Sequence, residues 1–157
     1  MVTLRPFNTY GPRQSARAII PTIISQGLTQ PKLRLGNLSP VRDLNFVKDT
    51  VSAFMTLAEA PDEVLGGVYN AGTGKGITIG DLAETILKLL DVSKDIEVAQ
   101  ERLRPEKSEV FELICDATAL REVSGWKAEY SLEDGLLETI DFIRENPDFC
   151  RPTRYET

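Results

Sequence analysis

The chain has 157 residues, of which 41% are hydrophobic and 27% charged, and its net charge is −6 at pH 7. These values are typical of a globular protein with about one domain. No apolar run approaches the ~20 residues of a membrane-spanning helix, and the acidic balance argues against nucleic acid as a partner. Two cysteines and the lack of a secretory signal pattern favour a reducing, cytoplasmic location.

The sequence contains no histidine. Histidine is the commonest general base and a common zinc ligand. Serine–histidine hydrolysis, cysteine–histidine proteolysis and histidine-bound zinc chemistry are therefore excluded within these residues. Cys115 and Cys150 have no metal-ligand spacing, so we expect no metal site.

Charge is unevenly distributed along the chain. Residues 1–48 contain seven Lys or Arg and one acid, Asp43, which gives this part +6 and leaves −12 for the remainder. A basic segment in an acidic chain favours a small anionic ligand. The alternative is an ordinary solvated basic face.

Strands and helices alternate in the predicted order, which indicates an α/β fold. We expect strands or extended segments at 2–5, 32–35, 42–46, 68–70, 96–98 and 108–115. Helices are expected at 17–28, 47–58, 79–90, 116–125 and 131–146. The first strand is expected to be buried, whereas residues 147–157 have no pattern and are expected to form a mobile tail.

Three helices have apolar residues at helical spacing. The predicted buried stripes are Val47, Val51, Phe54, Met55 and Ala58; Ile79, Leu82, Ala83, Ile86, Leu87 and Leu90; and Leu132, Leu136, Leu137, Ile140 and Ile143. A capping box over residues 78–81 predicts the start of the second of these helices.

Two arginines and an amide are candidate ligands for phosphate oxygens. Asn8 follows the end of the first strand, where ligands gather in open α/β sheets. Arg42 lies between a loop and a strand, and Arg104 precedes a proline; guanidinium groups bind phosphate bidentately. The alternatives are a turn-forming role for Asn8 and surface ion pairs of the arginines with Asp43 and Glu106.

The glycine turn at 72–76 superficially resembles a phosphate-binding loop. It lacks the spacing of both the dinucleotide and the Walker motifs, so a tight strand-to-helix connection is the better interpretation. Asp116 is expected to be a helix cap and Trp126 a core residue.

Several segments then occur in a recognisable order: LRPFNTYGPR at 4–13, LGNLSPVRDLNFVKD at 35–49, YNAG at 69–72, RPEKSEV at 104–110, DATAL at 116–120 and GW at 125–126. Over residues 2–146 they resemble the C-terminal half of extended short-chain dehydrogenases, the NAD-dependent nucleotide-sugar epimerases and 4,6-dehydratases. UDP-N-acetylglucosamine and GDP-mannose 4,6-dehydratases are especially similar. The resemblance implies the C-terminal part of a Rossmann-like α/β fold with its small substrate-binding subdomain.

The resemblance also implies roles for five residues. Phe7 would lie against the nicotinamide end of NAD, and Asn8 would contact the sugar or diphosphate of a UDP- or GDP-sugar. Arg42 and Arg104 would clamp the diphosphate, and Glu109 would hydrogen-bond the ribose.

The Tyr-x-x-x-Lys pair and the glycine-rich NAD loop of that family do not occur in this sequence. We therefore expect no catalytic residue here: residues 1–146 would be a substrate-binding half, with residues 1–10 contributing a strand to a Rossmann sheet that is otherwise missing. Most of the NAD site would lie on the missing half, and a full-length member would form a homodimer. There are two alternatives. The chain could be the corresponding half of a nucleotide-sugar 4-epimerase of the same family, or a non-catalytic module that binds a nucleotide-sugar or another protein.

Overall fold

The computed structural model describes residues 1–100 and 110–149. These residues form two compact units. Unit 1 comprises residues 1–10, 41–77 and 111–132, and unit 2 takes the remaining segments. Each unit contains helices and short parallel strand pairs, which confirms the predicted α/β class.

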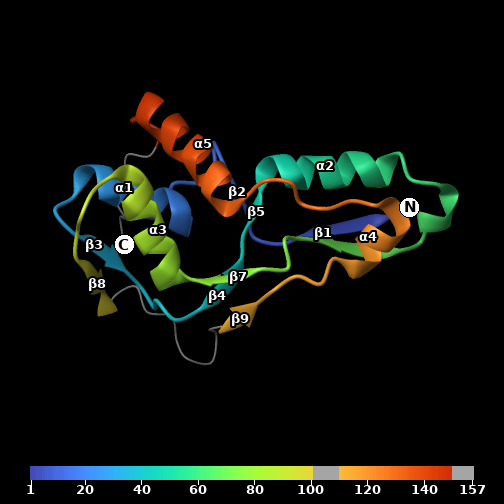
Figure 1. Ribbon diagram of the computed structural model, residues 1–157, viewed down its shortest axis with the longest axis horizontal. Helices are drawn as coiled ribbons and strands as arrows, with labels where there is room; N and C mark the ends of the chain where they lie inside the picture. The colour runs from blue at the N-terminus through green and yellow to red at the C-terminus, as the bar shows by residue number, and fades with distance from the viewer. Residues whose placement is uncertain (101–109, 150–157) are drawn as a thin grey trace. The chain divides into compact units, whose positions relative to one another are not determined.

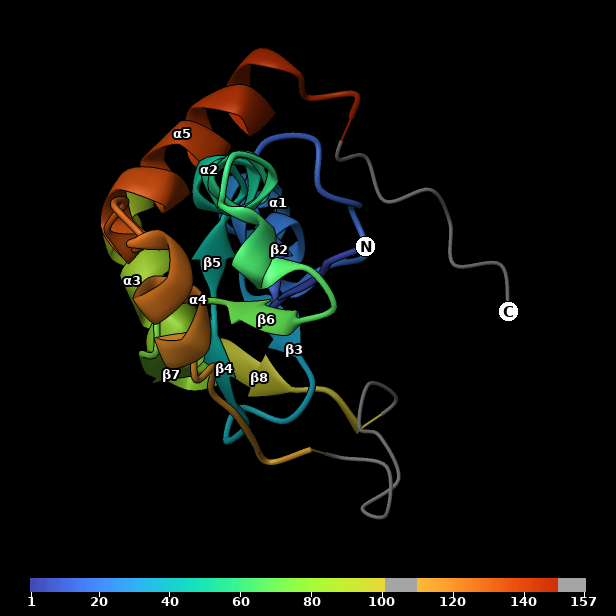
Figure 2. The ribbon, with the colours of Figure 1, turned by 90° about the vertical axis from the view of Figure 1, so that its right-hand side faces the viewer.

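Unit 1 is built around two parallel strands. β1 (Thr3–Pro6) pairs with β6 (Val68–Ala71), with Thr3 opposite Val68 and Pro6 opposite Ala71. Helix α2 (Val47–Ala58) runs along this pair, and the short helix α4 (Thr118–Ser124) contacts both β6 and α2 (Figure 1). The turned view in Figure 2 also places α2 over β6.

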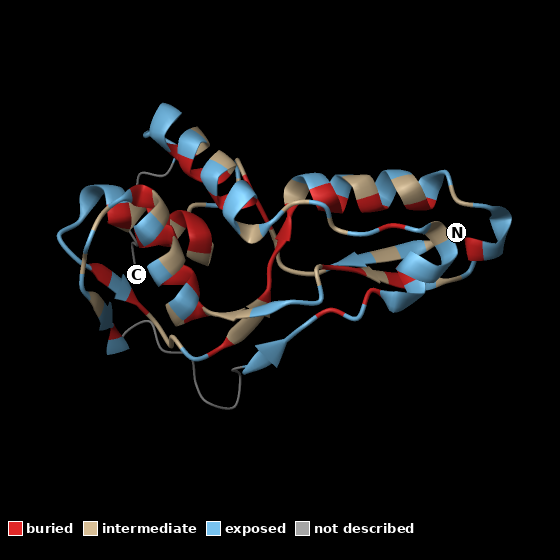
Figure 3. Cartoon of the chain, viewed as in Figure 1, coloured by how far each residue is buried: buried red, intermediate tan, exposed pale blue. Residues whose placement is uncertain are grey.

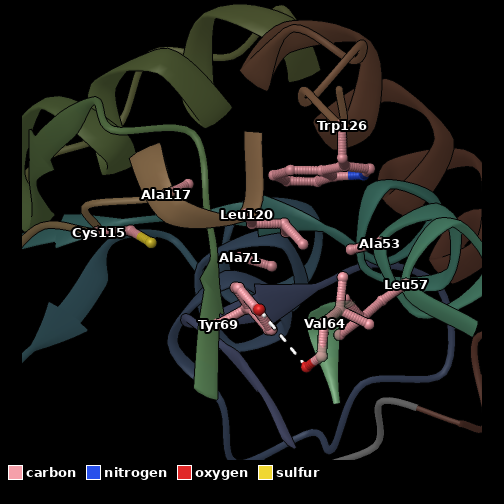
Figure 4. Close-up of a cluster of buried hydrophobic side chains, with 9 residues drawn as sticks. All are labelled: Ala53, Leu57, Val64, Tyr69, Ala71, Cys115, Ala117, Leu120 and Trp126. Atoms are coloured by element: carbon pink, nitrogen blue, oxygen red, sulfur yellow. Dashed lines mark hydrogen bonds between the residues drawn. The ribbon is translucent and has the colours of Figure 1, made fainter. Parts of the chain in front are cut away.

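The core of unit 1 lies between these elements (Figure 4). Its buried members are Ala53, Leu57, Val64, Tyr69, Ala71, Cys115, Ala117, Leu120 and Trp126. The Tyr69 hydroxyl donates to the carbonyl of Val64, in the 3-10 helix η1 (Asp62–Val64), at 3.4 Å. The expected core position of Trp126 is confirmed.

Two smaller strand groups complete unit 1. β4 (Val41–Asp43) lies between β7 (Gly76–Thr78) and β9 (Glu112–Leu113). β2 (Thr9–Tyr10) pairs in parallel with β5 (Asn45–Phe46). The strand predicted at 42–46 is therefore two strands, interrupted at Leu44.

Unit 2 contains α1 (Ile19–Thr29) packed on α3 (Ile79–Leu90), the parallel pair β3 (Leu33–Leu35) and β8 (Ile96–Val98), and most of α5 (Leu132–Glu145). All six apolar residues predicted for the α3 stripe are buried. The capping box is confirmed too, because the Thr78 hydroxyl accepts from the backbone N–H of Asp81 at 3.0 Å.

Helix α2 buries a different face from the predicted one. Val51, Phe54 and Met55 are 55%, 51% and 56% exposed. Exposed positions recur along this helix (Figure 3). The buried residues are Asp49, Thr50, Ala53 and Leu57. The prediction was wrong because two polar residues, which apolar periodicity ignores, form hydrogen bonds that orient the helix.

Two further expectations of burial were wrong. In β1, Thr3, Arg5 and Pro6 are exposed and only Leu4 packs against the core, because β6 is the only strand paired with β1 within the described ranges. In α5, Leu137 was expected to be buried but is exposed, whereas Thr139, which was not part of the predicted stripe, is buried.

No helix among residues 1–100 and 110–149 is both long and apolar enough to cross a membrane. Residues 150–157, most of the expected tail, lie outside the described residues.

Candidate binding site in unit 1

Asn8 follows β1 and is hydrogen-bonded to the β4–β5 segment through both its side chain and its backbone. Its Nδ2 donates to the carbonyl of Asp43 at 3.1 Å, and its own carbonyl accepts from the N–H of Asn45 at 3.2 Å. These bonds place Asn8 beside the residue that follows Arg42. The structure thus places Asn8 and Arg42 on neighbouring segments that are hydrogen-bonded to each other.

Arg42 is half-buried at the centre of β4. Its Nη1 donates to the carbonyl of Val41 at 2.8 Å. Arg42 makes no ion pair within the residues that the structure describes. The alternative prediction, a surface ion pair between Arg42 and Asp43, is therefore wrong. Within residues 1–100 and 110–149, no other acceptor bonds to its guanidinium N–H groups.

The carboxylate of Asp43 is instead fully buried and accepts four hydrogen bonds. Thr73 donates from its N–H at 3.1 Å and from its hydroxyl at 2.6 Å. The N–H groups of Gly74 and Cys115 donate at 2.8 Å and 3.1 Å. The glycine turn therefore does hold an anion, but that anion is the chain's own carboxylate, which confirms a structural role for the turn.

Gly72 allows this arrangement because the chain passes very close to it. A Cβ at this position would lie 2.4 Å from the Cβ of Cys115 and 2.9 Å from Oδ2 of Asp43. Any larger residue would push the turn away from the carboxylate. The glycine content of this segment thus serves close approach rather than phosphate binding.

A chain of side-chain hydrogen bonds supports the turn that carries Asn8. Asn45 Nδ2 donates to the Thr50 hydroxyl at 2.9 Å, which lies 2.9 Å from the Thr9 hydroxyl. The Thr9 hydroxyl donates to the carbonyl of Phe7 at 3.2 Å. Since Thr9 uses its one proton on Phe7, Thr50 is the donor to Thr9. These bonds hold the turn in place, although the buried Oδ1 of Asn45 has no hydrogen-bond partner among the described residues.

The other predicted site residues stand as follows. Phe7 is half-buried and packs against the core of unit 1. Arg104 and Glu109 lie outside the described residues, so their convergence with Arg42 stays a prediction. Asp116 was expected to cap α4, but the N-cap is Ala117, so that prediction was wrong. The Asp116 carboxylate instead accepts from the N–H of Thr118 at 2.9 Å, and its hydrogen bonds with Thr118 lower its pKa.

Sequence reasoning missed the supporting carboxylates. Asp49, at the start of α2, is buried and accepts from the N–H groups of Glu129 and Tyr130 at 2.9 Å and 3.2 Å. Together with Asp43 it joins segments far apart in the sequence. The available signal was an acidic residue in the predicted strand 42–46 and another in the first turn of the predicted helix 47–58, because a carboxylate that becomes buried there requires nearby donors.

Cys115 is not a nucleophile in this structure. Burial raises its pKa to about 12, and the charges of Asp43 and Asp116 contribute to the same shift. The thiol therefore stays protonated at neutral pH, and its role is packing and the backbone bond to Asp43.

Parallel strand pairs with helices packed against them, together with the polar groups that follow β1 and β4, define a Rossmann-like α/β protein. The chain belongs to the extended short-chain dehydrogenases that act as nucleotide-sugar epimerases and dehydratases: the family model described as GDP-mannose 4,6 dehydratase matches residues 1–139. This is a family of NAD-dependent enzymes. The resemblance inferred from the sequence is confirmed.

Individual relatives agree with this family. The chain is 29% identical over 150 residues, 95% of its length, to a trifunctional UDP-glucose 4,6-dehydratase/UDP-4-keto-6-deoxy-D-glucose 3,5-epimerase/UDP-4-keto-L-rhamnose-reductase of Arabidopsis thaliana, of which it covers 22%. It is 28% identical to the structure of dTDP-glucose 4,6-dehydratase from Bacillus anthracis in complex with NAD, with a TM-score of 0.85 over 98% of this chain and 47% of that one.

The structure of UDP-glucose 4-epimerase with UDP-glucose from Thermotoga maritima is 29% identical, with a TM-score of 0.77 over 92% of this chain and 46% of that one. The chain thus spans less than half the length of these relatives.

Proposed function

We propose that this chain is the substrate-binding portion of an NAD-dependent nucleotide-sugar 4,6-dehydratase and that it binds the diphosphate of a UDP- or GDP-sugar. The observation that carries the proposal is the bond from Asn8 to the carbonyl of Asp43, directly beside Arg42. Asn8 follows β1 and Arg42 lies in β4, and an amide and a guanidinium group are donors of the kind that a diphosphate requires.

The assigned roles are as follows. Arg42 and Arg104 neutralise the two phosphates, Asn8 hydrogen-bonds the sugar or diphosphate, and Glu109 accepts from the ribose hydroxyls. Asp43 is a positioning residue, because its four bonds hold β4 in place. None of these residues abstracts a proton or carries a covalent intermediate.

NAD, when bound, accepts and returns the hydride in this family. Within the described residues Phe7 is the one we assign to the cofactor, and its half-buried ring, fixed against the core, fits contact with a flat pyridine ring. No Tyr-x-x-x-Lys occurs in the 157 residues, so we expect binding without turnover by this chain alone.

A nucleotide-sugar 4-epimerase portion is the second candidate. It is favoured by the likeness to the Thermotoga maritima 4-epimerase, and it would use the same binding residues.

Isothermal calorimetry tests the proposal with UDP-N-acetylglucosamine and GDP-mannose. Arg42→Ala and Arg104→Ala should each weaken binding by about 1.5–3 kcal/mol, the usual contribution of a charge-assisted hydrogen bond. Arg17→Ala, which removes an exposed arginine of the same basic segment, is the control and should leave binding unchanged. Unaltered affinity in both test variants would remove the arginines from the site.

A further inference from the structure

Unit 1 contains a cavity of about 610 Å³ whose described lining residues include neither Asn8 nor Arg42. The glycine turn, α4 and the segment 126–132 contribute its lining residues. This volume is within the usual range for small-molecule pockets, roughly 300–1,000 Å³.

The charged side chains that line the cavity are all cationic: Lys75, Arg121 and Lys127. All three residues are exposed, and none has an ion pair within the part of the chain that the structure describes. Arg121 contributes to lowering the pKa of the nearby Asp116, which is not a lining residue. Three cationic side chains thus line one cavity in a chain whose net charge is −6.

Two aromatic side chains form a fixed part of the wall. Trp126 is 5% exposed, and its indole Nε1 donates to the hydroxyl of Ser52 at 2.9 Å. The ring of Tyr130 packs on that of Phe46, with centroids 4.9 Å apart. Because both rings are held by other contacts, they need little ordering when a flat ligand binds.

The glycine turn adds no hydrogen-bond donor from Thr73 or Gly74. Their N–H groups and the Thr73 hydroxyl are already bonded to the carboxylate of Asp43. The lysine and arginine side chains would therefore supply the recognition of an anion, and the aromatic wall would supply the apolar contact.

We propose that this cavity is a second binding site, for a phosphate monoester with a flat aromatic body. Three cations suit a ligand with two negative charges better than a ligand with one, such as a carboxylate. A phosphate monoester is close to a dianion at neutral pH because its second pKa is about 6. The site is separate from the proposed diphosphate clamp, since neither Asn8 nor Arg42 lines it.

Nuclear magnetic resonance of the full chain with phenyl phosphate as the probe tests this site. Trp126 is the only tryptophan, so its indole N–H gives one assignable signal at the cavity wall. Phenyl phosphate should shift this signal and the amides of Lys75 and Lys127 in a saturable way. Benzyl alcohol, which lacks the charge, and inorganic phosphate, which lacks the ring, should each bind more weakly. Equal binding of either one would overturn the assigned ligand class.

The variant Lys75→Gln/Arg121→Gln/Lys127→Gln should bind phenyl phosphate about tenfold more weakly, the sum expected for three exposed charge contacts. Lys88→Gln, which removes an exposed lysine on α3, is the matched control and should bind as the parent does. Equal affinity of the triple variant, or shifts that never saturate, would overturn the proposal. All three altered residues are exposed, so the fold should persist, and unchanged amide signals of β1 and α2 in the same unit verify this.

Arg42→Ala separates this inference from the proposed function. It should weaken the binding of UDP-N-acetylglucosamine by about 10- to 150-fold and leave the phenyl phosphate shifts intact. Displacement of phenyl phosphate by UDP-N-acetylglucosamine would show a shared site and so contradict the inference. Loss of phenyl phosphate binding with nucleotide-sugar binding retained would contradict it without affecting the diphosphate clamp.

Discussion

The side-chain amide of Asn8 donates a 3.1 Å hydrogen bond to the backbone carbonyl of Asp43, 35 residues further along the chain. The carboxylate of the same Asp43 is bonded to Thr73, Gly74 and Cys115. One aspartate thus connects the proposed substrate amide, the strand that carries Arg42 and the glycine turn. The geometry of the proposed site depends on this connection.

We predict that Asp43→Ala destabilises unit 1 by about 3 kcal/mol, because it leaves buried N–H donors without an acceptor. Urea unfolding followed by the fluorescence of Trp126, which lies in unit 1, measures the loss. Added formate, which can occupy the vacated position, should restore part of it. Asp95→Ala, at an exposed position, is the control and should change stability by less than about 0.5 kcal/mol. An equal effect of the two substitutions would contradict the role given to Asp43.

We predict that the contribution of Cys115 to stability is lost at high pH. Its pKa is raised by burial from 9.0 to about 12 in the folded chain. The contribution is therefore complete below pH 9.0 and declines between pH 9.0 and about 12, where the unfolded chain loses the thiol proton first. The test compares the free energy of unfolding of Cys150→Ser with that of Cys150→Ser/Cys115→Ala over this pH range. A pH-independent difference would contradict it.

We predict that the two faces of α2 respond differently to truncation. Leu57→Ala, at a residue that is 4% exposed, should cost about 2–5 kcal/mol of unfolding free energy. Phe54→Ala removes more carbon but should cost less than about 1 kcal/mol in this chain, because that ring is half exposed. Chemical denaturation measures the unfolding free energy of both variants. A larger loss for Phe54→Ala would indicate that α2 buries the face predicted from the sequence pattern.

The contrast between α3 and α2 shows what the sequence could predict. In α3, apolar spacing and the capping box agree, and both its buried face and its first turn follow from them. In α2, Asp49 and Thr50 bond to Tyr130 and Thr9, residues far away in the sequence. Local periodicity contains no information on such partners, so it assigned the wrong face.

The candidate site shows the same limit. Strand ends, turn composition and family resemblance sufficed to select Asn8 and Arg42, and the structure places these two residues on hydrogen-bonded neighbouring segments. The bonds of Asp43 depend on the close approach of Gly72 to Cys115, a contact across 43 residues that no local pattern specifies. Sequence reasoning therefore assigned the glycine turn its structural role but did not identify the anion it holds.

The most direct test of the central claim is a double-mutant cycle on nucleotide-sugar binding. Calorimetry with UDP-N-acetylglucosamine would compare Arg42→Ala, Arg104→Ala and the double variant. If both guanidinium groups hold one pyrophosphate, the losses should be non-additive, with an interaction energy of about 0.5–3 kcal/mol. Strictly additive losses, or no loss in either single variant, would show that the two arginines do not act on the same ligand group.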